Sequence, residues 1–158
     1  MAWSNSKVFR AFVQTCISVP AEALDLDADT FKAALYDNDI TPSSDVTQAN
    51  SCYNADQWVT TGNEVFDGAE WPQGGQTMGT LAINVATTLR LRWTAANTAS
   101  GSSATLAAVF GALVYDDTST SPNDQGVCYN YFGGTNSVTD GTFTIVWNST
   151  SGVMEFQF

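Results

Sequence analysis

The chain has 158 residues, of which 44% are hydrophobic and 13% are charged, so it is long enough for one packed core and too short to suggest two domains. Sixteen acidic residues against five basic ones leave a net charge of −11, which argues against binding of nucleic-acid phosphates by Lys and Arg. Histidine is absent, which removes the commonest general base and the commonest zinc ligand and excludes the usual hydrolase triads. Thr, Ser, Asn, Gln and Gly carry the polarity, and a Thr-rich, Lys-poor surface suits β-strands.

The first predicted element is a short amphipathic helix within residues 1–20. Ser4 and Ser6 are candidate N-caps, and Pro20 marks the end of the helix or a loop just beyond it. Polar residues fall opposite an apolar face that contains Val8, Phe9, Phe12, Val13, Cys16 and Ile17.

The same stretch shares some features with a secretory signal peptide. A fairly apolar segment follows Lys7 and Arg10, and residues 21–23 (Ala-Glu-Ala) have the small-x-small form of a cleavage site. Gln14 and Thr15, however, interrupt the apolar block that a signal peptide needs. We therefore expect an uncleaved helix. No run approaches the roughly 18 apolar residues that cross a bilayer.

Short strands at fairly regular spacing make up the rest of the prediction. Residues 44–58 are expected to be a loop with a helical turn, and residues 116–125 and 133–134 to be turns. Residues 148–152 should join the last two strands as a hairpin. The expected strands are 30–36, 64–67, two within 80–95, 104–115, 126–132, 142–147 and 153–158. A short buried helix is the alternative for 104–115.

This pattern predicts a mainly β fold, an antiparallel β-sandwich or small barrel with a short N-terminal amphipathic helix. We expect a single domain over 1–158, with the helix in 1–20 and the β-domain in 29–158.

Cys16, Cys52 and Cys128 lie in separate elements with no CxxC pair, so we expect reduced thiols without a disulfide or a metal site. The predicted core residues are Leu81, Ile83, Leu106, Val109, Leu113, Phe143, Ile145 and Trp147.

Carboxylates offer the only candidates for metal or acid–base chemistry. Asp25, Asp27 and Asp29 have the first three ligand spacings of a calcium loop, but the sixth position is Thr30 instead of Gly and the twelfth is Tyr36 instead of Glu. A solvated acidic turn is the better interpretation.

Two carboxylate pairs, Asp116-Asp117 and Asp37/Asp39, suggest a glycosidase, in which two carboxylates serve as acid and base. Nothing in their spacing shows that they converge, and Asp after a buried strand is ordinary turn chemistry. We assign no catalytic, cofactor or metal residues and expect no enzyme.

Aromatic residues are the remaining candidates for a binding site. They suggest a stacking platform for sugar rings, although Trp147 ends an apolar alternation that puts it on the core face of its strand. A carbohydrate-binding module for host-surface glycans is retained as an alternative function. The platform candidates are Trp58, Trp71, Tyr129, Tyr131 and Trp147.

Several segments together resemble a family of small virion proteins encoded by tailed bacteriophages. The opening segment, residues 1–9 (MAWSNSKVF), is similar to the form found in phages of actinobacteria. The resemblance covers nearly the whole chain and contains no catalytic motif. The other matching segments are 31–38 (FKAALYDN) with Thr41-Pro42, 53–58 (YNADQW), 111–117 (GALVYDD), 131–134 (YFGG) and 141–148 (GTFTIVWN).

The resemblance implies a structural protein, most simply a capsid decoration or minor capsid protein, with a tail-associated protein as the alternative. The implied partners are the major capsid protein and copies of this chain, most simply as a trimer, with no nucleic acid, membrane or cofactor. The implied location is the capsid surface of the virion, after synthesis in the host bacterial cytoplasm. The N-terminal helix either covers its own domain or anchors it to the virion partner through Trp3, Phe9 and Phe12.

Overall fold

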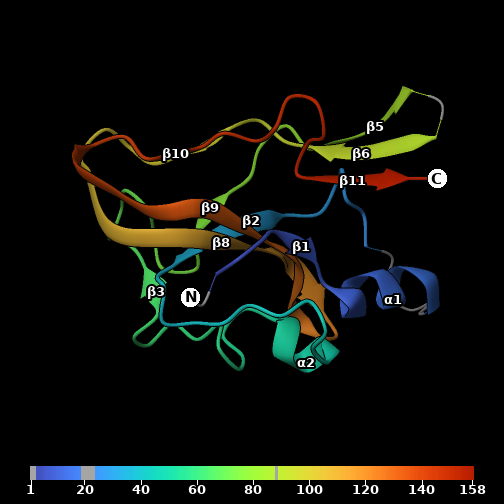
Figure 1. Ribbon diagram of the computed structural model, residues 1–158, viewed down its shortest axis with the longest axis horizontal. Coiled ribbons are helices and arrows are strands. Elements are labelled where there is room, and N and C mark those ends of the chain that lie inside the picture. The colour runs from blue at the N-terminus through green and yellow to red at the C-terminus, as the bar shows by residue number, and fades with distance from the viewer. Residues whose placement is uncertain (1–2, 19–23, 88) are drawn as a thin grey trace.

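The computed structural model describes residues 3–18, 24–87 and 89–158, and this part of the chain is mainly antiparallel β structure (Figure 1). The main sheet has the strand order β1-β9-β8-β2-β3, and β4 also pairs with β2. The described strands form open sheets and no closed barrel, so the β-sandwich is the correct one of the two predicted architectures. The strands of the main sheet are β1 (Lys7–Val8), β2 (Phe31–Tyr36), β3 (Glu64–Val65), β4 (Gln76–Thr77), β8 (Ala104–Thr120) and β9 (Asn123–Gly141).

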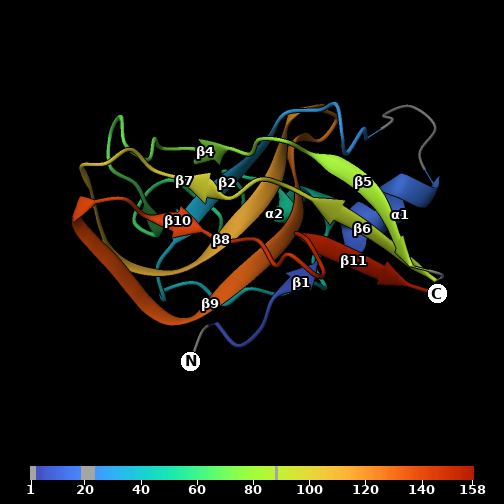
Figure 2. The same cartoon turned by 90° about the horizontal axis from the view of Figure 1, so that it is seen from above.

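Two smaller sheets form the second layer above the main sheet (Figures 1 and 2). One pairs β7 (Thr98–Ala99) with β10 (Thr144–Ile145), and the other has the order β11-β6-β5. The rings of Phe31 and Trp93 meet between the layers with centroids 4.8 Å apart. The strands of the larger of these two sheets are β5 (Ala82–Thr87), β6 (Arg90–Thr94) and β11 (Met154–Gln157).

An aromatic cluster covers the opposite face of the main sheet. Trp58 lies at its centre, with the rings of Trp3 and Phe9 each 6.0 Å away and Tyr36 5.1 Å away between centroids. The indole nitrogen of Trp3 donates a hydrogen bond to the carbonyl oxygen of Asp37 at 2.6 Å. The main sheet is therefore buried on both faces, which explains why β2 reads as an almost continuous apolar run.

The N-terminal helix, α1, is shorter than predicted and presents a different face to the core. It spans Arg10–Ser18, because residues 7 and 8 instead pair with β9 as the short strand β1. This pairing sets the rotation of the helix, so that Ala11, Phe12 and Thr15 are buried while Cys16 and Ile17 are exposed.

The predicted boundaries of this helix also change. Ser4 and Ser6 do not cap it, and the hydroxyl oxygen of Ser6 accepts the backbone N–H of Tyr131 instead. Pro20 and the cleavage-like segment 21–23 lie outside the described residues. No helix in the described ranges is long and apolar enough to cross a membrane.

The β8–β9 hairpin is much longer than the sequence pattern predicted. Most of the segment 116–125, expected to be a turn, continues the two strands, and the Ser121–Pro122 connection has a cis peptide bond. Asp116 makes this possible, because its carboxylate accepts the backbone N–H groups of Thr118 and Ser119 where the strand register shifts. Residues 133 and 134, also expected to end a strand, lie within β9.

The predicted C-terminal hairpin is wrong, although both strands exist in shortened form. β10 pairs with β7, and β11 pairs with β6. Between them the Asn148 side chain accepts the N–H groups of Thr150 and Ser151, forming a turn that sends the chain from one small sheet to the other.

The strand predicted at 30–36, the pair within 80–95, and the helical turn, α2 (Gln48–Ser51), are present, whereas the strand predicted at 64–67 is shortened to Glu64–Val65. Most predicted core residues are buried: Leu106, Val109, Leu113, Ile145 and Trp147. Leu81 and Phe143 are partly buried, whereas Ile83 is 38% exposed and is not a core residue. The three cysteines are free in this structure.

Candidate functional site

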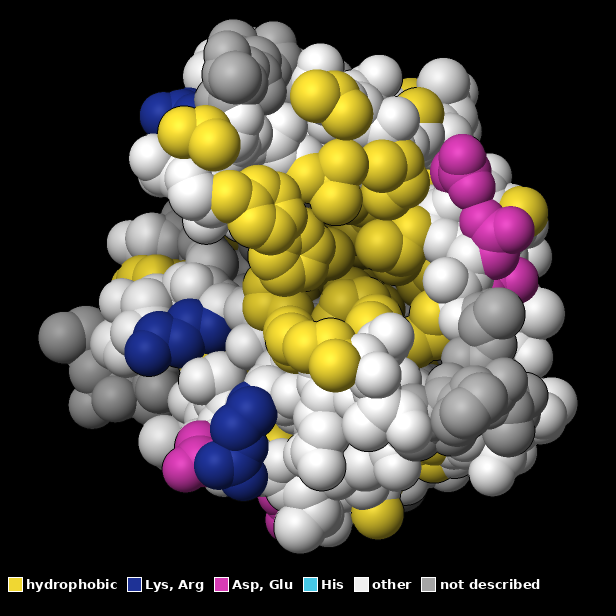
Figure 3. Space-filling model, turned by 90° about the vertical axis from the view of Figure 1, so that its right-hand side faces the viewer, with side chains coloured by type: hydrophobic (Ala, Val, Ile, Leu, Met, Phe, Trp, Pro, Cys, Tyr) yellow, Lys and Arg dark blue, Asp and Glu magenta, His cyan; other side chains and the backbone are white. Residues whose placement is uncertain are grey.

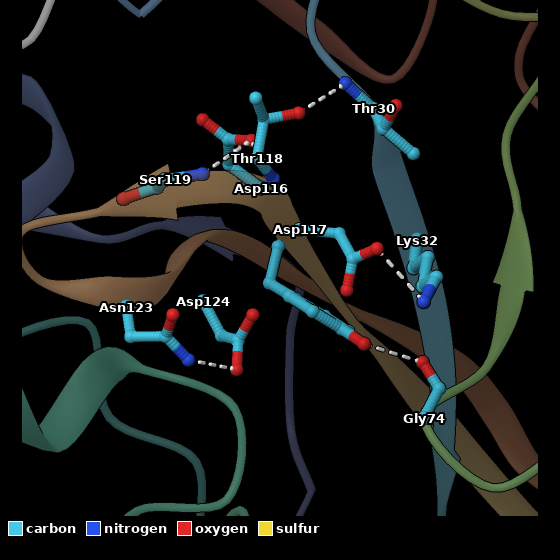
Figure 4. Close-up of polar contacts among 10 residues, drawn as sticks. Thr30, Lys32, Gly74, Asp116, Asp117, Thr118, Ser119, Asn123 and Asp124 are labelled. Atoms are coloured by element: carbon cyan, nitrogen blue, oxygen red, sulfur yellow. Dashed lines mark hydrogen bonds and ion pairs between the residues drawn. The ribbon is translucent and has the colours of Figure 1, made fainter.

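The Asp116-Asp117 pair lies beside β2 at one end of the β8–β9 hairpin (Figure 4). Asp117 forms an ion pair with Lys32 at 2.8 Å, and Asp116 is buried and caps two backbone N–H groups. Burial raises the pKa of Asp116 above its ordinary value. Each carboxylate is thus engaged in a local contact, and this pair does not form a two-carboxylate site.

A second carboxylate, Glu64, is buried in a hydrogen-bonded network that the sequence did not reveal. Its carboxylate accepts hydrogen bonds from the hydroxyl of Tyr53 at 3.0 Å and from the backbone N–H of Gly74 at 2.6 Å. Tyr53 stacks on Tyr115, whose hydroxyl donates to the carbonyl of Gly74 at 2.7 Å. Burial raises the pKa of Glu64. The network ties the loop at Gly74 to β8.

The remaining acidic candidates, Asp37/Asp39 and Asp25–Asp29, lie in turns that their own side chains stabilise. Asp37 accepts the N–H of Asp39, and Asp29 accepts the N–H of Asp25 at 2.7 Å. The pKa of Asp27 is raised through its side-chain hydrogen bond with Asp25 and the repulsion between the two charges. Within the described ranges, no three His, Cys, Asp or Glu residues are arranged to hold a metal ion.

The proposed anchor residues are enclosed by this chain itself. Trp3, Phe9 and Phe12 are each at most 1% exposed, and the first two belong to the aromatic cluster around Trp58. This is the arrangement in which the N-terminal segment covers its own domain, and none of the three side chains is presented to a partner.

The proposed aromatic platform does not form as a unit. Trp58 and Trp71 are fully buried, and Tyr129 is 2% exposed. Tyr131 and Trp147 do lie together along one cleft.

The surface that remains open is one face of the β5–β6–β11 sheet. The strand register places Val85, Leu91 and Phe156 side by side in one row across the sheet. A second row of the same face contains Trp93, which is buried against Phe31. On the opposite face Glu155 forms ion pairs with the two arginines of β6. One face is therefore apolar and the other is polar.

The apolar face extends beyond the core, and no described residue covers this part of it. Seven large hydrophobic side chains are exposed in the described part of the chain, and five of them belong to α1 or to this sheet and its ends. Figure 3, which views the molecule from this end, shows hydrophobic side chains gathered in a hollow. We call these five residues the apolar end face: Ile17 (81% exposed), Ile83, Val85 (80%), Leu89 and Phe158 (75%).

Negative charge borders this end face. The indole of Trp93 donates to the carbonyl of Leu26 at 2.6 Å, which places the Asp25–Asp29 turn next to the sheet. Four of the five Lys and Arg residues are already in ion pairs with carboxylates of this chain. Arg90 and Arg92 share the single carboxylate of Glu155, so the negative charge beside the apolar surface is that of the Asp25–Asp29 turn.

The sequence predicted that the β6 strand has an apolar face, but it did not predict that the face is exposed. Leu89, Leu91 and Trp93 alternate with Arg90 and Arg92, which correctly predicts a strand with one apolar face. Alternation does not reveal whether the same chain covers that face. Comparison with protein-family models, with curated proteins and with solved structures finds no match to this chain.

Proposed function

We propose that this protein is a non-enzymatic structural component of a bacteriophage virion, a capsid decoration or minor capsid protein that binds the head shell through its apolar end face. The observation that carries the proposal is the exposure of Ile17, Val85 and Phe158 at one end of the described structure. Exposed apolar side chains gathered on one part of a protein surface mark sites of interaction with other molecules. The end face is thus a docking surface.

The partner that fits is a head-shell protein presenting apolar side chains flanked by Lys or Arg. The apolar part complements the end face, and basic residues complement the Asp25–Asp29 turn beside it. A chain with net charge −11 gains more from a basic partner than from a second acidic copy at the same surface. Copies of this chain, most simply three, are then brought together by neighbouring positions on the shell.

The resemblance to virion proteins supports the structural role and concerns mainly the main sheet. Its segments 31–38, 111–117 and 131–134 lie in β2, β8 and β9 or directly beside them, within the main sheet. The end face lies outside these segments and supplies the binding surface.

Purified virions of the encoding phage test the location. Mass spectrometry should find the protein at a fixed ratio to the major capsid protein, and cryo-electron microscopy should place it on the head. Detection only in the tail would instead support the tail-associated alternative, and absence from virions would overturn both.

Binding to heads that lack the protein tests the surface. The double variant Ile17→Ser/Phe158→Ser should bind such heads at least about tenfold more weakly, because it removes two exposed apolar anchors. Val146→Ser is the matched control, since Val146 is similarly exposed (72%) but lies on a different part of the fold. Equal binding of the wild type and the double variant would overturn the assignment of the end face.

A further inference from the structure

A separate cleft lies between β9, β10 and the Asn148–Gly152 turn, and the end-face proposal makes no use of it. It has a volume of about 620 Å³, within the range of small-ligand sites. Its lining combines aromatic rings with amide and hydroxyl side chains and contains no Asp, Glu, Lys or Arg. In a protein with net charge −11, a cleft of this size without a charged side chain is distinctive.

The aromatic side of the cleft consists of Tyr131, Phe132, Phe143 and Trp147. Each ring is held by a further contact: Phe143 packs edge-on against Trp71 and lies 6.3 Å from Phe132 between centroids. Tyr131 stacks on Trp3, and the indole of Trp147 donates to the hydroxyl of Thr98 at 3.1 Å. These rings are therefore fixed in place before any ligand binds.

The polar side of the cleft consists mainly of three asparagines whose hydrogen-bonding capacity is only partly used. The Oδ1 of Asn148 is occupied by its turn, and the Nδ2 of Asn136 donates to the carbonyls of Val109 and Gly134. The Nδ2 of Asn130 has only a long contact of 3.5 Å to the sulfur of Cys128. Each amide thus retains a donor or acceptor group for a ligand.

We infer that this cleft binds a neutral oligosaccharide. A sugar ring presents an apolar C–H face that packs on aromatic rings, and hydroxyls that both donate to and accept from amides. A purely apolar ligand would leave the remaining donor and acceptor groups of the three asparagines unpaired, and an ionised ligand would find no counter-charge in the lining. This site is independent of the end face and adds glycan recognition to the proposed structural role.

An array of neutral, anionic and cationic oligosaccharides, followed by calorimetry with the best neutral binder, tests the inference. Thr144 lines the cleft and is exposed on β10, so Thr144→Arg should block the site without disturbing the core and weaken binding at least about tenfold. Asn130→Ala should also weaken binding, because it removes an amide from the lining.

Thr139→Arg is the matched control, because Thr139 is exposed on β9 outside the cleft and the change in size and charge is identical. Its affinity should stay within about twofold of the wild type, and thermal melting should confirm that all three variants fold. The inference is overturned if no neutral glycan binds, if only charged glycans bind, or if Thr144→Arg binds normally. Variants that lose glycan binding but still join virus heads would show that the two sites act separately.

Discussion

The indole nitrogen of Trp93 donates a 2.6 Å hydrogen bond to the carbonyl oxygen of Leu26, a residue 67 positions earlier in the chain. The same indole ring packs edge-on against Phe31 of the main sheet, with centroids 4.8 Å apart. One side chain therefore connects three parts of the molecule: the β5–β6–β11 sheet, the main sheet and the acidic turn.

Replacing Trp93 separates these two contacts. Trp93→Phe keeps an aromatic ring against Phe31 but loses the hydrogen bond, so it should lower the free energy of unfolding by about 1–3 kcal/mol. Trp93→Ala also leaves a cavity and should cost about 3–5 kcal/mol. Urea denaturation measures both values, and equal costs would show that ring packing contributes nothing.

The double variant Phe9→Ser/Phe12→Ser should fail to give a stable folded monomer. Both side chains are fully enclosed, and removing one buried Phe costs about 3–5 kcal/mol, against a typical total stability of about 5–15 kcal/mol. Circular dichroism and denaturation measure the loss, with Ile17→Ser on the exposed side of the same helix as the control. A folded double variant that no longer joins virions would instead support the anchor role of these residues.

The three cysteines should differ sharply in reactivity. Cys16 is exposed, whereas Cys52 and Cys128 are buried. Burial raises the pKa of Cys128 to about 12 and also raises the pKa of Cys52, and partial desolvation raises the pKa of the Cys16 thiol on α1. We expect iodoacetamide to modify Cys16 alone in the native protein, slowly at neutral pH because little thiolate is present, and all three thiols after denaturation. Rapid native labelling of Cys128, detected by peptide mass spectrometry, would contradict this.

Mild acid should stabilise the fold. Burial raises the pKa of Asp37, Glu64, Asp116 and Asp124 above their ordinary values. Each group therefore binds its proton more tightly in the folded state than in the unfolded state. As the pH falls through the raised pKa values, the free energy of unfolding increases, and as the pH rises through them it decreases. The melting temperature should therefore be higher at pH 5 than at pH 8.

Glu64→Gln provides the control for this pH dependence. The amide cannot titrate but keeps an oxygen acceptor for the Gly74 N–H, so the variant should show a smaller difference between pH 5 and pH 8. A melting temperature that falls steadily from pH 8 to pH 5 would show that the buried carboxyls do not control the pH dependence of stability.

The sequence by itself determined the fold class and the positions of most strands. Segments such as 31–36 and 90–94 were predictable because side-chain direction alternates along a strand, so burial leaves a local apolar pattern. Absence of histidine and the excess of acidic residues were equally visible, since composition does not depend on the fold.

Only the tertiary structure decided which strands pair and which apolar faces are covered. Pairing of β1 with β9 moved the start of the helix and buried Trp3 and Phe9, while pairing of β10 with β7 replaced the expected hairpin. The same apolar alternation gives a buried Trp93 and an exposed Val85, which lie on neighbouring strands of one sheet. Local pattern cannot distinguish these two residues, because burial depends on what other parts of the chain place opposite each side chain.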